Sequence, residues 1–270
     1  MEGGALRPAG LYRAVAGEGP IWHMGAIWYV DIRAPAVIRY DPETDEDVVF
    51  DAPETVAALA PLAGGILVAG RTALWALRDG AFQVHTPTPF IPGTHRFNDG
   101  CTDPRGRFLA GTTAMEGGAA DGELWSFDEA GSRLLMSGFR TINGLAVSPD
   151  GRSLTVSDSH PDVATVWRCA YDAATGVAGR PEVFARLPKG RPDGACFDAK
   201  GGYWIAATSA GMLLRYDATG AVTGSVACGT PRVSKPCLCG ADGRDLYVTT
   251  ISLGHEDDPR AGRLLRGRLP

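Results

Sequence analysis

The sequence predicts an all-β protein: a single six-bladed β-propeller domain over residues 1–270, with four-stranded antiparallel blades and a ring closed by an N-terminal strand. Two observations predict it. The 36 glycines and 19 prolines are spread along the chain, and between them lie short runs rich in valine, isoleucine, leucine, tryptophan and tyrosine, as in many short strands. These runs also recur at a nearly constant spacing. No segment keeps the apolar period of a helix.

The recurring unit is an apolar run, a short gap, a second apolar run and a turn rich in Asp and Gly. The six first runs begin at Trp28, Leu67, Phe108, Leu154, Tyr203 and Leu246. Their spacings are 39, 41, 46, 49 and 43 residues, which suits propeller blades of four short strands each. Two packed sandwiches are the competing architecture.

The later strands follow in order. The second runs lie at residues 38–42, 74–80, 124–131, 166–172, 213–220 and 264–269, and five repeats add a further strand at 48–50, 82–84, 133–136, 183–185 and 222–226. The sixth repeat has no such strand before the chain stops. We expect residues 11–15 to supply it, because pairing the two ends in one blade removes two exposed sheet edges.

Composition excludes several classes of function. The 26 Lys and Arg residues against 31 Asp and Glu give a formal net charge of −5, unsuited to binding nucleic acid or an anionic membrane. The six cysteines include no C-x-x-C pair, the N-terminus has no signal-peptide pattern, and the longest charge-free apolar stretch is the 16 residues 55–70, too short to span a bilayer. We expect a cytoplasmic monomer or weak homodimer.

Four of the six repeats carry a side-chain oxygen about ten residues before the first run, where the innermost strand of a blade begins. These residues are Glu18, Asn98, Asn143 and Asp193. The corresponding positions in repeats two and six are Ala57 and Pro236. Turn formation beside glycine is the alternative explanation for each position alone. Together, ring symmetry gathers them near one axis, where carboxylates repel one another unless a cation or proton is present.

An oxygen-only set predicts a divalent metal ion as cofactor. Without Cys or neighbouring His, the ligands suit a hard ion such as calcium, magnesium or manganese, with zinc also allowed. Three or four protein ligands leave coordination positions open, as in a catalytic rather than a structural metal site.

Four ordered motifs resemble the regucalcin (senescence marker protein)/gluconolactonase/luciferin-regenerating-enzyme family, and bacterial sugar lactonases most. They are Gly-Glu-Gly-Pro-Ile-Trp at 17–22, Arg-Phe-Asn-Asp-Gly at 96–100, Ile-Asn-Gly-Leu at 142–145 and Pro-Asp-Gly at 192–194. The resemblance implies a metal bound by Glu18, Asn143 and Asp193, with Asp193 also the general base. It also implies substrate contacts from the side chains Arg96, Asn98 and Glu116.

The function that follows is metal-dependent hydrolysis of a small-molecule sugar lactone to the aldonic acid, with the metal as Lewis acid and a carboxylate as base. Two alternatives stay open. One is another metal-dependent lactonase or phosphotriesterase on the same scaffold, and the other is a non-catalytic metal-binding propeller. For Arg96, an ion pair with an acid such as Asp99 is the alternative to substrate binding.

Overall fold

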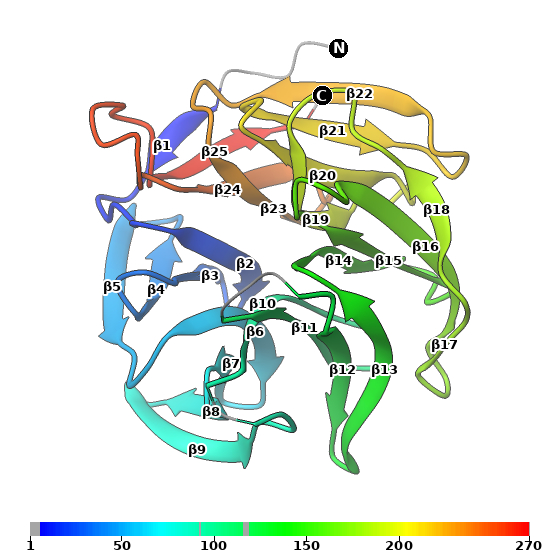
Figure 1. Cartoon of the computed structure of the whole chain (residues 1–270). Helices are drawn as coiled ribbons and strands as arrows, with labels where there is room; N and C mark the ends of the chain where they lie inside the picture. Colours follow the sequence, from blue (N-terminus) through cyan, green and yellow to red (C-terminus); the bar gives the residue numbers. More distant parts are fainter. Residues whose placement is uncertain (1–5, 92, 116–118, 270) are drawn as a thin grey trace.

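The computed structural model describes residues 6–91, 93–115 and 119–269, which form 25 strands in six antiparallel sheets. The sheets stand around a centre like the blades of a propeller (Figure 1). The innermost strands are β2 (Gly17–His23), β6 (Val56–Leu62), β10 (His95–Thr102), β14 (Ile142–Val147), β19 (Arg191–Phe197) and β23 (Val233–Cys239). Each contacts the next in this order, and β23 contacts β2, so the ring is closed.

The expected repeat is confirmed strand by strand. The second strands are β3 (Ala26–Asp31), β7 (Gly65–Gly70), β11 (Phe108–Ala114), β15 (Ser153–Asp158), β20 (Tyr203–Thr208) and β24 (Asp245–Thr250). The third strands are β4 (Ala36–Asp41), β8 (Ala73–Arg78), β12 (Gly122–Asp128), β16 (Thr165–Asp172), β21 (Met212–Tyr216) and β25 (Leu264–Arg268).

The outermost strands are more variable. They are β5 (Glu46–Asp51), β9 (Ala81–Pro87), β13 (Gly131–Phe139), β17 (Val177–Ala178) with β18 (Glu182–Ala185), β22 (Val222–Ala227) and β1 (Arg7–Ala9). In the fourth blade β17 and β18 pair separately with β16. Gly179 and Pro181 lie between them, and neither residue favours a continuous strand.

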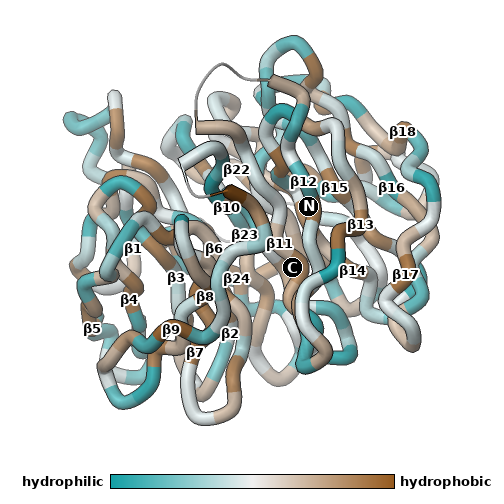
Figure 2. The backbone as a smooth tube through the Cα atoms, turned by 60° about the horizontal axis from the view of Figure 1, so that its bottom comes forward, coloured by the Kyte–Doolittle hydropathy of each residue, from teal (hydrophilic) through white to brown (hydrophobic). Residues whose placement is uncertain are grey.

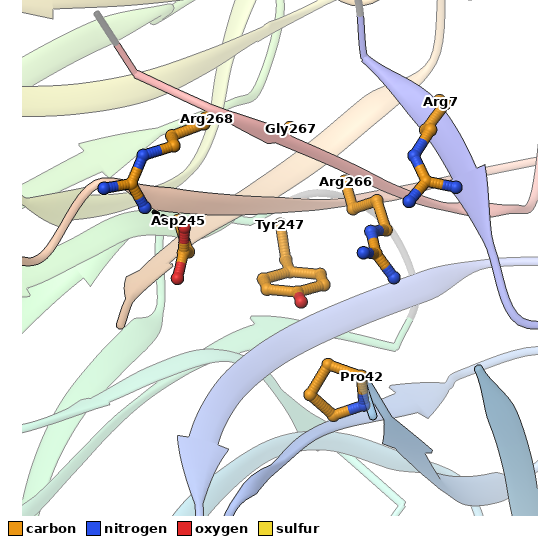
Figure 3. A pocket seen from close by; sticks show the side chains of 7 residues that line it. All are labelled: Arg7, Pro42, Asp245, Tyr247, Arg266, Gly267 and Arg268. Atoms are coloured by element: carbon orange, nitrogen blue, oxygen red, sulfur yellow. Dashed lines mark hydrogen bonds and ion pairs between the residues drawn. The ribbon is translucent and has the colours of Figure 1, made fainter. Parts of the chain in front are cut away.

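An N-terminal strand does close the ring, but the expected segment, residues 11–15, was wrong. The strand is β1, which pairs antiparallel with β25 so that Arg7 lies opposite Arg266 (Figure 3). In the sequence, Pro8 and Gly10 argue against a strand at this place. β1 forms nevertheless because it is an edge strand, where a proline is tolerated. Residues 11–15 instead continue into the first blade, where the Leu11 N–H donates to Asp47.

All six innermost strands carry one extra residue relative to their partner at the same place. This β-bulge follows Glu18 in β2, contains Asn98 in β10, follows Asn143 in β14 and contains Asp193 in β19. A bulge re-aims a side chain, which places these four at equivalent points of the ring. In the sixth blade the bulge lies at Ser234. The expectation that Pro236 occupies the equivalent position was therefore wrong, because Pro236 pairs regularly with Val248.

Hydrophobic residues form six clusters, one between each pair of neighbouring blades. The cluster between the sixth and first blades includes Cys237, Cys239, Ile27 and Tyr40. Hydrophilic segments gather at the turns (Figure 2). The stability of the ring therefore comes from blade-to-blade contacts, which also fix the axial ends of the innermost strands.

The described residues include no helix that is long and apolar enough to span a membrane.

Candidate active site at the propeller axis

A pocket of about 310 Å³ opens at the axis and is lined by residues from five of the six blades. It brings together five of the six expected site residues: Glu18, Arg96, Asn98, Asn143 and Asp193. The sixth, Glu116, lies outside the described residues.

Glu18 and Asp193 bring two buried carboxylates into this pocket from β2 and β19. Glu18 is 5% exposed and Asp193 is 9% exposed. Burial, followed by repulsion from Asp193 and Asp99, raises the pKa of Glu18 well above its ordinary value. Burial and repulsion from Asp99 raise the pKa of Asp193 to about 7. The two acids therefore resist being ionised together unless positive charge is placed between them.

Asn143 adds an amide oxygen without a partner. Its Nδ2 donates to Ser159 Oγ at 2.5 Å, which fixes the amide plane. The buried Oδ1 accepts no hydrogen bond from any described residue. Gly144 follows with a φ of +62°, and a Cβ there would lie 2.6 Å from Ser157 Oγ, so glycine is needed for this turn.

These three side chains fit a divalent cation. Two buried carboxylates and one unsatisfied amide oxygen form an oxygen-only ligand set, which suits a hard cation. Among residues 6–91, 93–115 and 119–269, no group of three His, Cys, Asp or Glu side chains could hold a metal ion. A third protein oxygen in this pocket is available from the amide of Asn143.

A third buried carboxylate, Asp99, already has a positively charged partner. Lys235 Nζ lies 2.5 Å from Asp99 Oδ1 and donates to the Gly100 carbonyl at 2.7 Å. The other oxygen, Asp99 Oδ2, accepts the Leu145 N–H at 2.9 Å. Burial alone would lower the pKa of Lys235, but the Asp99 carboxylate raises it, so the ammonium stays charged. Neither residue lines the pocket, and Asp99 does not pair with Arg96.

Arg96 and Asn98 instead bond to one another. Arg96 Nη1 donates to Asn98 Oδ1 at 3.0 Å and to the Phe97 carbonyl at 2.9 Å, while Asn98 Nδ2 donates to the Ile142 carbonyl at 3.0 Å. The pair therefore has a fixed orientation beside the carboxylates. The remaining guanidinium N–H groups of Arg96 can donate to a ligand in the pocket.

Loops after the second strands supply residues that sequence analysis missed. In the fourth blade, Asp158 accepts the backbone N–H groups of Arg140, Thr141 and His160, and so holds the loop that places Ser159 and His160 at the pocket. In the first blade, Asp31 accepts the N–H of Arg33. In both loops the signal available in the sequence was an aspartate at the end of an apolar strand.

Two further arginines at the pocket were also missed. Arg191 opens β19 and Arg232 precedes β23, each two residues before its bulge position. The bulge puts Asp193 at the axis, and the residue two positions earlier lies on the same face of the strand. A search of alternate positions before the bulge could have found both arginines.

A family model described as the SMP-30/gluconolactonase/LRE-like region matches residues 16–252. The chain belongs to this family. The match covers all six bulge positions, and therefore the whole candidate site.

Named relatives agree with this membership. A pentonolactonase, XacC, of Haloferax volcanii is 33% identical, with 91% of this chain and 84% of that protein covered. A 6-deoxy-6-sulfogluconolactonase of Pseudomonas putida is 32% identical, with 88% and 84% covered. The solved structure of a calcium-binding protein, regucalcin, from Agrobacterium tumefaciens superposes with a TM-score of 0.89 at 24% identity, with 97% and 94% covered. This last likeness supports the fold alone.

Proposed function

We propose that this SMP-30/gluconolactonase/LRE-like protein hydrolyses a sugar lactone to its open-chain acid, using one divalent cation held by Glu18, Asn143 and Asp193. The observation that carries the proposal is the unsatisfied Asn143 Oδ1 in the same pocket as two buried carboxylates and Arg96. Relatives named as lactonases support the reaction class. Their names specify different sugar lactones, so the substrate of this chain has to be inferred from its own pocket.

The oxygen ligands suit calcium, magnesium or manganese, and zinc is the further candidate. When bound, such a cation supplies Lewis-acid polarisation of the ester carbonyl. Calcium is the first ion to test, because carboxylate and amide oxygens are its usual protein ligands.

Asp193 is the proposed general base. Hydrolysis adds water to the lactone carbonyl carbon, breaks the ring C–O bond and returns a proton to the ring oxygen. Without a cation, burial and then Asp99 raise the pKa of Asp193 to about 7. A bound cation would lower this pKa, but it would also acidify the attacking water, so a weaker base suffices. Hydrogen-bond donors for the sugar hydroxyls or the developing oxyanion come from Arg96 and Asn98. Glu116 stays a predicted substrate contact.

A pH-indicator assay across aldonolactones, with and without a chelator, tests the proposal. We expect acid release that stops on chelation and returns when the cation is added back. Acid release only from phosphotriesters or aliphatic lactones would instead support the other hydrolase. Bound cation without turnover of any ester would support the non-catalytic propeller. Full activity in chelator would contradict the metal role.

A further inference from the structure

Four arginines line the axial pocket: Arg33, Arg96, Arg191 and Arg232. We infer, resting on the proposed lactone hydrolysis, that the lactone bound here carries an acidic group such as a carboxylate away from its ester, and that Arg191, Arg232 and Arg33 bind that group. The four come from the loop after β3, from β10, from the start of β19 and from the segment before β23. Four different blades therefore each contribute one arginine to the same pocket.

None of these four arginines forms an ion pair among the described residues, although Arg191 and Arg232 lower the pKa of Asp193 through their charge. No Asp or Glu oxygen of the described chain lies within 4.0 Å of their guanidinium nitrogens. Arg232 Nε is buried and has no hydrogen-bond partner in that part of the chain. A buried donor left unpaired beside a pocket, as Arg232 Nε is, marks a place where a ligand acceptor can bind.

The charge balance favours an anion. Four arginines and two acids, Glu18 and Asp193, line the pocket, an excess of two positive charges, and a bound divalent cation would add two more. Burial, and then repulsion from Arg33, lowers the pKa of Arg96 to about 10, so at least these two cations repel one another. Neutral sugar hydroxyls need donors and acceptors but not this charge, whereas an oxyanion suits the planar guanidinium.

A second arginine-lined pocket shows the contrast. The pocket of about 420 Å³ at the closing seam is lined by Arg7, Arg266 and Arg268 (Figure 3). There Arg268 pairs with Asp242 and Asp245, and Arg266 bonds to the Tyr40 hydroxyl. Those two arginines are held by side chains of the protein, whereas Arg33, Arg191 and Arg232 of the axial pocket form no ion pair among the described residues.

The test compares two matched substrates, glucono-γ-lactone and glucaro-γ-lactone. They differ only at the terminal carbon, which is a hydroxymethyl group in the first and a carboxylate in the second. We expect metal-loaded protein to show about tenfold higher kcat/KM for the acidic lactone, as one charge-assisted contact provides. Arg191→Gln and Arg232→Gln should each lower this ratio about tenfold, and Arg232→Lys should retain part of it. Added salt should lower the ratio. The control is Arg7→Gln in the seam pocket, which should leave the ratio unchanged.

Calorimetric binding of glucarate and gluconate to metal-loaded protein separates this inference from the proposed reaction. Tighter binding of glucarate than of gluconate, lost in Arg232→Gln, would support the anion site. If no lactone is hydrolysed in addition, the proposed function is overturned but the anion site is not. Hydrolysis of both lactones at equal kcat/KM, with the ratio unchanged in the arginine variants, would overturn the anion site and leave lactone hydrolysis standing.

Discussion

Glu18 and Asp193 are held close together in a buried site, and this has a consequence for stability. The pKa of Asp193 is raised to about 7 by burial and by Asp99, against an ordinary value of 3.8. Between these two values the folded protein keeps a proton that the unfolded chain has lost. The contribution of Asp193 to stability without metal therefore falls as pH rises from about 4 to about 7. A cation reverses this, because it binds the ionised carboxylates.

We therefore expect the rise in Tm on adding calcium or manganese to chelated protein to grow between pH 5 and pH 8. Thermal unfolding at each pH, with chelator and with excess cation, measures it. In Asp193→Asn the metal-induced rise should be small at every pH. A rise that does not depend on pH in the unaltered protein would contradict the proposed ligand set.

Asp193→Asn should also lower kcat by about a thousandfold or more, because the amide cannot accept the proton of the attacking water. Without metal its Tm at pH 8 should equal or exceed that of the unaltered protein, because a repelled buried charge has been removed. Steady-state kinetics and thermal unfolding together distinguish loss of chemistry from loss of fold. Retained activity would remove Asp193 from the site.

At the scale of single residues, sequence alone located Glu18, Asn98, Asn143 and Asp193, because each precedes a recurring apolar run by a near-constant distance. It did not locate Arg33 or His160. These lie in loops whose path depends on backbone hydrogen bonds to Asp31 and Asp158, and the sequence does not show where such a loop turns.

At the scale of elements, the bulge in each innermost strand connects sequence to site. It places Asp193 in the pocket and Lys235 beside Gly194, where a Cβ would lie 2.5 Å from the lysine Cβ. An inserted residue shifts the phase of hydrophobic alternation, but these innermost strands are buried on both faces around the bulge, so they have no alternation that could reveal it. For this reason Pro236 was expected where Ser234 lies.

Lys235→Met should reduce the free energy of unfolding by about 3–5 kcal/mol, since it leaves Asp99 charged and 1% exposed without its partner. The double variant Lys235→Met with Asp99→Asn should recover much of this loss. Lys200→Met, at an exposed lysine, is the matched control and should change little. Chemical denaturation measures all three. Equal small effects for Lys235 and Lys200 would show that the buried pair contributes nothing.

At the scale of the whole molecule, six clusters between blades replace one central core, so closure by β1 affects two of them. Leu6 belongs to the cluster between the fifth and sixth blades, and Ala9 belongs to the cluster between the sixth and first. The repeat, the blade number and an N-terminal closing strand were all predictable from spacing. The particular closing segment was not, since pairing with β25 overrides the weak strand propensity of Pro8.

Leu6→Ala should destabilise the protein by about 2–4 kcal/mol, because it leaves a cavity beside a side chain that is 2% exposed. Leu11→Ala is the control: Leu11 lies in the segment first expected to close the ring, but it is 86% exposed and should contribute little. Denaturant unfolding compares them. A larger loss in Leu11→Ala would favour residues 11–15 as the closing strand.

The most direct test titrates chelated protein with a divalent cation while lactone hydrolysis and bound metal are measured in the same samples. The account predicts a rate that rises with occupancy and levels off at one ion per chain, with Asn143→Ala requiring a higher metal concentration. Full hydrolysis in the presence of chelator, or full activity with no ion bound, would contradict it.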